Sequence, residues 1–218
     1  MMMLRRHIRR EGDFTMSDRL VKTRPTIDHA ALSQLFLDAR TYNEFQNIPV
    51  SDAKLREAVD IAKMAPTSAN QSPLRVVFVR TPEAKERLRP ALAEGNLAKT
   101  MVAPVVAIAG YDLKFYEHLP FLFPHADAKA WFSGNEAFAT RAAFQNGTLQ
   151  VAYLILALRA VGLDTGPMTG FDNAKVDAEF FPDGNVKSNV LINIGYGDAT
   201  KLFPRSPRFS FDQIAKII

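Results

Sequence analysis

Apolar residues in the first third of the chain recur with the period of an α-helix. Between Ile27 and Leu37 they are spaced mostly three and four positions apart. After a polar break, Ser51 is a good N-cap for a helix whose body runs from Lys54 to Met64, and Pro66 closes that segment. The pattern therefore predicts two helices before the first strand.

Three β-rich runs follow, separated by further helices. Strands are predicted over 75–80, 102–110 and 188–194, and helices over 82–92, 148–161 and 174–180. The run 148–161 is apolar nearly all round, which is typical of a helix buried in a core or at a subunit interface. Residues 162–170 are predicted to form a glycine-bracketed loop. This order of elements indicates one α+β or α/β layered domain.

The net charge of the chain resides in its first 24 residues. The 218 residues include 27 basic and 23 acidic side chains, and residues 1–24 hold seven of the former and three of the latter. The remainder is neutral overall, which argues against a folded face that binds polyanions. We expect 1–24 to be a basic, disordered extension, or untranslated if Met16 is the true start, and 25–218 to form the domain. The alternative is a module that binds RNA or a membrane surface through this extension.

Several chemistries are excluded by what the sequence lacks. Without cysteine there is no disulfide scaffold, thiolate metal site or cysteine nucleophile. The longest apolar run, 151–158, is far shorter than the roughly 20 residues that cross a bilayer. The phosphate loop, the dinucleotide fingerprint and the serine elbow are absent, and no two histidines have helical metal-pair spacing. We therefore expect a cytoplasmic protein without a metal, a nucleic acid or a membrane partner.

Aromatic residues are concentrated between Tyr111 and Phe138. These 28 positions hold eight of the 22 aromatics, together with prolines and a glycine that prevent one regular helix. Such a segment lines a pocket or forms a lid for a flat ligand; alternatively it packs on a neighbouring subunit. The candidate substrate-pocket residues are Phe115, His118, Phe121, Phe123 and His125.

Four separated clusters, over 39–45, 65–73, 95–99 and 162–172, together resemble the nitroreductase family of FMN-dependent oxidoreductases. The likeness extends over about residues 28 to 210. It implies an α+β fold with a mixed central sheet flanked by helices, FMN as bound cofactor, NADH or NADPH as reductant, and an intertwined homodimer with FMN at its interface.

Within the family the chain is similar to the malonic semialdehyde reductase branch of the pyrimidine-utilisation pathway. The stretches that carry this likeness are 38–41, 66–70, 119–125, 166–172 and 187–198. The resemblance implies reduction of malonic semialdehyde to 3-hydroxypropionate in pyrimidine degradation. A broad NAD(P)H-dependent nitro- or quinone reductase is the enzymatic alternative.

The resemblance also implies roles for single residues. Arg40, Thr41 and Arg205, with Arg208 nearby, match positions at the FMN phosphate, a dianion that needs charge-assisted donors. Asn96 and Lys99 match positions at the pyrimidine edge of the flavin ring. The remaining cofactor contacts are expected from two stretches, one beside the ring and ribityl chain and one on the opposite face with a backbone N–H near N5: Pro66, Thr67, Ser68 and Asn70, and Pro167, Met168, Thr169 and Gly170.

The chain departs from the common family pattern at three of these positions. Ala39 and Asn43 stand where many members have basic residues, and Thr169 stands where many have glutamate. Ala39 removes a phosphate contact, and Asn43 replaces a cation near N1 and O2 of the ring. The change at Asn43 is expected to weaken FMN binding or to lower the flavin potential, and the change at Thr169 is expected to alter the polarity of the pocket.

Overall fold

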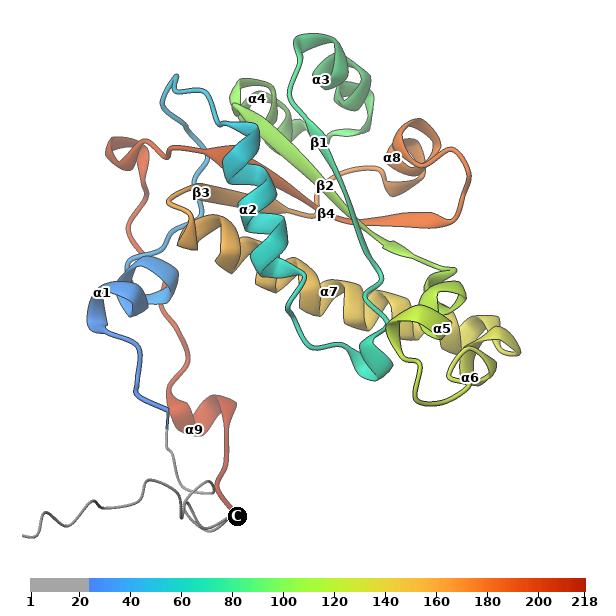
Figure 1. The fold of residues 1–218 in the computed structure, drawn as a ribbon. Coiled ribbons are helices and arrows are strands. Elements are labelled where there is room, and N and C mark those ends of the chain that lie inside the picture. The colour runs from blue at the N-terminus through green and yellow to red at the C-terminus, as the bar shows by residue number, and fades with distance from the viewer. Residues whose placement is uncertain (1–23) are drawn as a thin grey trace, which may run out of the picture.

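The computed structural model describes residues 24–218 (Figure 1). Apart from Arg24, the extension predicted over 1–24 lies outside the described residues. The central feature is a four-stranded sheet in the order β1-β2-β4-β3, and every neighbouring pair of strands is antiparallel. Its strands are β1 (Leu74–Val79), β2 (Val105–Asp112), β3 (Asp164–Met168) and β4 (Val186–Gly195).

The parallel component expected of a mixed sheet is limited to one bridge. Thr41 pairs in parallel with Thr165 of β3, outside the named strands. The α+β fold class predicted from the sequence is confirmed, and the strands themselves are antiparallel.

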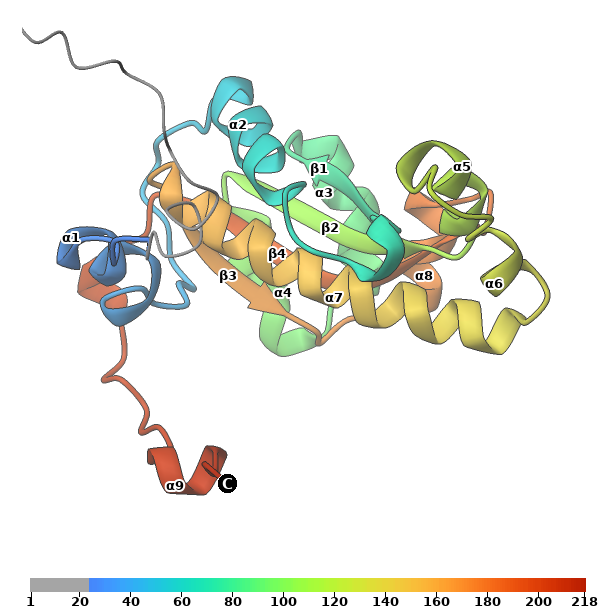
Figure 2. The same cartoon turned by 60° about the horizontal axis from the view of Figure 1, so that its bottom comes forward.

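Helices cover both faces of the sheet (Figure 2). Side chains alternate along β2, so that Val105, Ala107 and Ala109 pack toward α2 and α7, whereas Val106 and Ile108 pack toward the opposite side. The longer helices are α2 (Asp52–Ala62), α3 (Pro82–Leu88), α4 (Glu94–Val102), α7 (Glu136–Ala160) and α8 (Asn173–Phe180). Helices α2 and α7 cover one face, and α3, α4 and α8 lie on the other.

Short helical segments connect these elements. They are α1 (His29–Leu32), the π-helix η2 (Ser33–Leu37), η3 (Ser68–Asn70), η4 (Arg89–Ala91), η5 (Phe115–His118), α5 (Leu119–Leu122), α6 (Ala130–Ser133), η6 (Ala199–Lys201) and α9 (Phe211–Ile214). The segment after η6 leads away from the body and carries α9 (Figure 1).

Most predicted elements are confirmed, with small changes at their ends. Ser51 caps α2 by accepting a hydrogen bond from the Lys54 N–H at 3.3 Å. The strand predicted from 102 begins at Val105, because α4 runs to Val102 and Pro104 precedes the strand. The prediction of a loop over 162–170 is wrong, since residues 164–168 form β3. This is an edge strand, where Pro167 and its missing N–H are tolerated.

Helix α7 is longer than its apolar run and is not buried on every side. It begins at Glu136, capped by the Asn135 side chain, and it exposes Leu149 and Tyr153 on one side and Phe144 on the opposite side, with 52%, 41% and 48% of their surface accessible. The described chain therefore leaves apolar side chains of this helix open to a partner.

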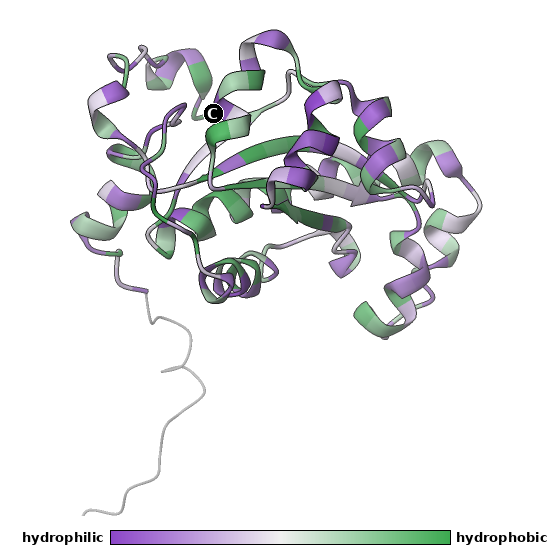
Figure 3. Ribbon diagram, turned by 90° about the horizontal axis from the view of Figure 1, so that it is seen from above, coloured by the Kyte–Doolittle hydropathy of each residue, from purple (hydrophilic) through white to green (hydrophobic). Residues whose placement is uncertain are grey.

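The aromatic segment folds into short helices and turns around a small core of its own. Phe115 is fully buried there and makes an edge-on contact with Phe132 at 5.0 Å between ring centroids. In Figure 3 green predominates in the central strands, whereas green and purple alternate along the surrounding helices, in keeping with helices that bury one side on the sheet. Among the described helices, none is long and apolar enough to cross a membrane.

Candidate functional site

The Arg40 segment lies along the free edge of β3. The Tyr42 N–H donates to the Thr165 carbonyl at 3.0 Å, and Thr41 forms the bridge to the same residue. Gly166 permits this approach, because a Cβ at that position would lie 2.3 Å from the Tyr42 carbonyl oxygen. The glycine that suggested a turn in the sequence instead seats the segment that carries Arg40 and Thr41.

Arginines from distant parts of the chain meet at this edge. Arg205 donates through Nη2 to the carbonyls of Leu37 (2.7 Å) and Ala39 (3.1 Å), and Arg40 donates to the Phe203 carbonyl at 2.5 Å. Neither guanidinium has a carboxylate partner among residues 24–218. Because no carboxylate neutralises them there, both guanidinium groups can attract an anion. Arg208 bonds only to the carbonyls of Ser206 and Pro207.

Helix α4 and the segment after β3 form the neighbouring part of the site. Asn96 Nδ2 donates to the Gly170 carbonyl at 2.8 Å, and the Ala93 N–H donates to the same oxygen at 3.2 Å. The approach is close, since a Cβ on Gly170 would lie 2.5 Å from Asn96 Nδ2. Thr169 and Gly170 are exposed and Pro167 is half-buried, whereas the Met168 side chain is buried in the core and offers only its backbone. Lys99, half-buried on α4, has no ion-pair partner in the described part of the chain.

The electrostatics of this edge are set by few groups. Burial raises the pKa of Tyr42, and Asp164 raises it further, whereas Arg40 lowers it. Asp164 accepts a hydrogen bond from the Gly197 N–H at 2.8 Å through Oδ2. Asn43 is half-buried beside Tyr42 and brings no charge.

The loop over 66–70 lies elsewhere in the protomer. The Ser68 N–H donates to Asn146 Oδ1 of α7 at 2.8 Å, and Asn70 Nδ2 donates to the Leu122 carbonyl of α5 at 2.8 Å. Ala69 and Asn70 adopt φ of 49° and 50°, and Ser72 adopts 41°, in the left-handed region. This loop is thus joined to the aromatic segment and not to Arg40.

The five aromatic and histidine candidates are not gathered into one pocket. Phe115 lies in the core, and His118 Nε2 is 3.7 Å from Asp112 Oδ2. Phe123 packs against His125 at 5.6 Å between ring centroids, and Phe121 is 85% exposed on α5. Phe121, Phe123 and His125 remain available on the aromatic segment, whereas Phe115 supports it from within.

The predicted site residues therefore form two groups within one protomer. The segment that leads to Arg40 contacts α7 at Arg159 through the Leu35 carbonyl, and the 66–70 loop contacts α7 at Asn146. These two positions are 13 residues apart, which corresponds to about 20 Å along the helix. The loop over 66–70 is held by α7 on one face of the sheet, while α4 lies on the other (Figure 2).

Related proteins show to which family the chain belongs. Residues 36–196 match the sequence model of the nitroreductase family. The chain belongs to the nitroreductase family. A protein of Burkholderia lata, named as a candidate NADH dehydrogenase/NAD(P)H nitroreductase, is 62% identical over 192 residues, which cover 88% of this chain and 98% of that protein. The chain is therefore an oxidoreductase.

Solved nitroreductase structures share the fold. A candidate nitroreductase of Bacillus subtilis superposes with a TM-score of 0.77 at 21% identity, covering 87% of this chain and 99% of its own. A candidate nitroreductase of Exiguobacterium sibiricum, in complex with FMN, superposes with a TM-score of 0.75 at 19% identity, covering 90% and 100%.

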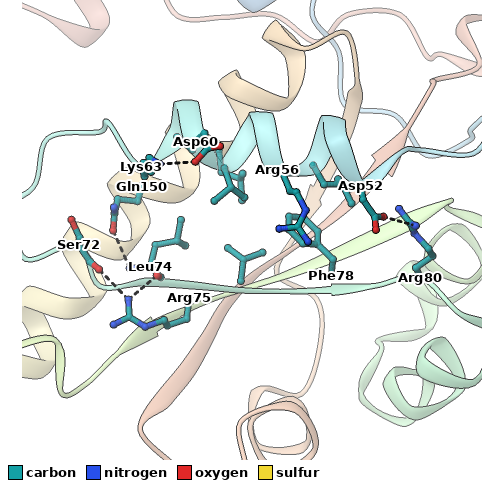
Figure 4. Close-up of a pocket in the computed structure, with 15 residues that line it drawn as sticks. Asp52, Arg56, Asp60, Lys63, Ser72, Leu74, Arg75, Phe78, Arg80 and Gln150 are labelled. Carbon is teal, nitrogen blue, oxygen red and sulfur yellow. Dashed lines mark hydrogen bonds and ion pairs between the residues drawn. The ribbon is translucent and has the colours of Figure 1, made fainter. Parts of the chain in front are cut away.

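A cleft between α2 and β1 begins at Ser72, close to the 66–70 loop (Figure 4). Its volume is about 790 Å³, its floor is apolar with Leu74 and Phe78 of β1, and Arg56 of α2 and Lys63, which caps that helix, lie among its charged residues. None of the predicted site residues lines it. The cleft follows the unpaired edge of β1, which is open to a further strand.

Proposed function

We propose that this nitroreductase-family protein is an FMN-dependent oxidoreductase that takes electrons from NADH or NADPH. The observation that carries the proposal is that β3 links two sets of polar groups: Arg40 and Arg205 lie by its beginning, and the Asn96–Gly170 hydrogen bond lies just after its end. Cations without carboxylate partners lie at one end of this strand, and amide and backbone groups lie at the other. The two ends of FMN match these two sets of groups: its phosphate is a dianion, and its ring both donates and accepts hydrogen bonds.

The donor set at the phosphate end fits that group. Arg40 and Arg205 donate their observed hydrogen bonds to backbone carbonyls. No carboxylate within residues 24–218 therefore competes with a phosphate for their charge. The Thr41 side chain is exposed beside them. Charge-assisted bonds of this kind are about twice as strong as neutral ones.

The groups at the ring end also fit. Asn96 holds the segment after β3 through its Nδ2, and its Oδ1 is an acceptor that no donor in the described chain uses. The Gly170 N–H has no acceptor within residues 24–218. Lys99 would lie near the pyrimidine edge, where its charge stabilises an anionic reduced ring. When bound, FMN would supply the hydride chemistry, so the protein needs no acid–base triad.

We further propose that the working unit is a homodimer. Each of its two flavin sites would combine the arginine-bearing edge of one protomer with the 66–70 loop of the other. Two observations support this arrangement. The loop over 66–70 lies about 20 Å along α7 from the arginine-bearing edge. Leu149 and Tyr153, which lie one turn apart on the same side of α7, are exposed. A second copy would cover these side chains and bring its own loop and aromatic segment to the flavin.

The proposed substrate is malonic semialdehyde, reduced to 3-hydroxypropionate in pyrimidine degradation. Its support is the resemblance of five stretches of the sequence to that branch of the family. A nitro- or quinone reductase is the second candidate, and the name of the Burkholderia lata relative favours it.

The first experiment is to purify the protein, incubate it with FMN, remove free flavin and record the absorption spectrum. We expect a bound yellow chromophore, and a protein that stays colourless would contradict the proposal. NADH and NADPH oxidation is then measured with malonic semialdehyde and with a nitroaromatic acceptor in parallel. Faster turnover of the aldehyde supports the proposed substrate, and faster turnover of the nitroaromatic favours the second candidate.

A further inference from the structure

A third arginine, outside every sequence cluster of the site, lies at the arginine-bearing edge. Arg159 occupies the last turn of α7, and its Nη1 donates to the Leu35 carbonyl at 2.9 Å. In return, Gln34 Nε2 donates to the Arg159 carbonyl at 2.7 Å. The end of α7 is thereby joined to the π-helix η2.

Arg159 and Arg205 bind alternate carbonyls of one segment. Arg159 takes that of Leu35, and Arg205 takes those of Leu37 and Ala39. The next residue is Arg40, which donates back to the segment that carries Arg205 through the Phe203 carbonyl. The direction in which Arg40 and Thr41 leave this segment therefore depends on both arginines.

Positive charge at this junction exceeds negative charge. The Arg159 side chain is about half-buried, and its Nε is buried without a partner within the described residues. Burial lowers the pKa of Arg159, Arg205 lowers it further, and Asp164 opposes the shift. The three guanidinium groups of this junction outnumber its nearby carboxylates, Asp38 and Asp164, and a bound dianion would offset their mutual repulsion.

We propose that Arg159 is a positioning residue for the phosphate of the cofactor. It orders the Leu35–Ala39 carbonyls that aim Arg40 and Thr41, and it adds positive charge behind them. This inference rests on the proposed binding of FMN. It assigns a function to a residue that a sequence would class as a basic residue near a helix C-terminus.

Riboflavin separates this role from general support of the fold, because it has the same ring as FMN but no phosphate. The flavin-free protein is titrated with each ligand, following the quenching of flavin fluorescence, in wild type and in Arg159→Met. We expect Arg159→Met to weaken FMN binding about tenfold or more and to change riboflavin binding less than twofold. The positive charge of Arg159 and its hydrogen bond to the Leu35 carbonyl, which orders the Arg40 segment, matter only to the ligand that carries a phosphate.

Lys54→Met is the matched control, because Lys54 Nζ also donates to a carbonyl at the end of α7, that of Val161, without joining the arginines. It should leave the ratio of the two affinities unchanged. Equal weakening of FMN and riboflavin in Arg159→Met would overturn the proposal and leave Arg159 a structural residue. Unchanged binding of both ligands would overturn it as well.

Two further outcomes are distinguishable. If Arg159→Met does not fold, Arg159→Lys supplies the comparison, with a loss of about threefold in the FMN-to-riboflavin ratio expected and an unchanged ratio contradicting the inference. If the wild type binds neither flavin, the proposed function itself fails, independently of any Arg159 variant.

Discussion

Two buried amides of α7 hold the loop before β1 in a conformation that its own residues disfavour. Asn146 accepts from the Ser68 N–H at 2.8 Å, and Gln150 accepts from the Leu74 N–H at 2.9 Å. Between them, Ala69 and Ser72 have positive φ, which costs about 1–3 kcal/mol for each residue. The loop that we assign to the flavin of a second protomer is therefore shaped by α7 and not by local preference.

Asn146→Leu is expected to lower the free energy of unfolding by about 1–3 kcal/mol, because the Ser68 N–H loses its acceptor. Urea denaturation measures the change. Asn189→Ala is the control, since its amide bonds only to the Thr148 hydroxyl at the surface and its loss should stay within about 0.5 kcal/mol. Equal effects in the two variants would contradict the role of Asn146.

Lys85 of α3 is buried against the C-terminal end of α4. Its Nζ donates to the carbonyls of Met101 (3.2 Å) and Ala103, where α4 ends, and burial lowers its pKa below the ordinary 10.5. Above the lowered pKa the folded chain binds fewer protons than the unfolded chain, so stability rises with pH until 10.5 is reached.

Urea denaturation at several pH values tests this linkage. The wild type should gain stability over Lys85→Met as the pH rises through that window, and the two should run parallel at lower pH. Parallel curves throughout would show that burial does not shift the pKa of Lys85.

At the scale of elements, β3 is the strand that most directly positions the site. Gly166 lets the Arg40 segment lie on it, and Gly95 in α4 has nothing within 4 Å of where a Cβ would be. The two glycines therefore have opposite tolerance for a methyl group although both belong to the predicted flavin clusters.

Gly166→Ala is expected to lower the free energy of unfolding by about 1–3 kcal/mol and to weaken FMN binding, because its Cβ would displace the Tyr42 carbonyl. Gly95→Ala should instead raise stability by about 0.5–1 kcal/mol, since alanine is the better helix former. Denaturation and FMN titration of both variants are the measurements. A stabilised Gly166→Ala protein would refute the close approach at β3.

Elements that are stabilised by their own residues could be predicted from the sequence, whereas elements that depend on distant residues could not. Helix α2 and strands β1 and β4 have caps, prolines and β-branched runs within their own residues, so local patterns found them. Strand β3 contains Gly166 and Pro167 and is a strand because β4 pairs with it, which no local pattern records. The clusters of the site were visible as motifs, but Arg159 was not, because a basic residue in the last turn of a helix is common.

At the scale of the whole molecule, the apolar surface of the described chain exceeds what one protomer covers. The segment that includes α9 exposes Phe209, Phe211, Ile214 and Ile217 by 73%, 59%, 72% and 86%. The cleft between α2 and β1 offers an apolar floor beside an unpaired strand edge (Figure 4). We expect the segment of one copy to pack on the other, because the described protomer leaves these side chains exposed and their burial against a second copy would be favourable.

Removal of residues 209–218 is expected to shift the protein from dimer to monomer and to reduce flavin retention. Light scattering over a range of concentrations measures the first effect, and the visible spectrum measures the second. Lys201→Asp serves as the control, because it changes an exposed charge outside the removed segment and should leave the mass unchanged. A full-length protein that is monomeric and still holds FMN would contradict the shared site.

The separation of the two residue groups along α7 implies that two defective alleles would complement each other. A chain with Arg40→Ala keeps an intact 66–70 loop, and a chain with Asn70→Asp keeps an intact arginine-bearing edge. In a mixed dimer one site would receive both intact halves and the other site neither. Co-expression of the two genes should then restore about a quarter of the wild-type flavin sites when subunits mix at random. Co-expression of Arg40→Ala with Arg205→Ala should restore none, since both alleles damage the same half.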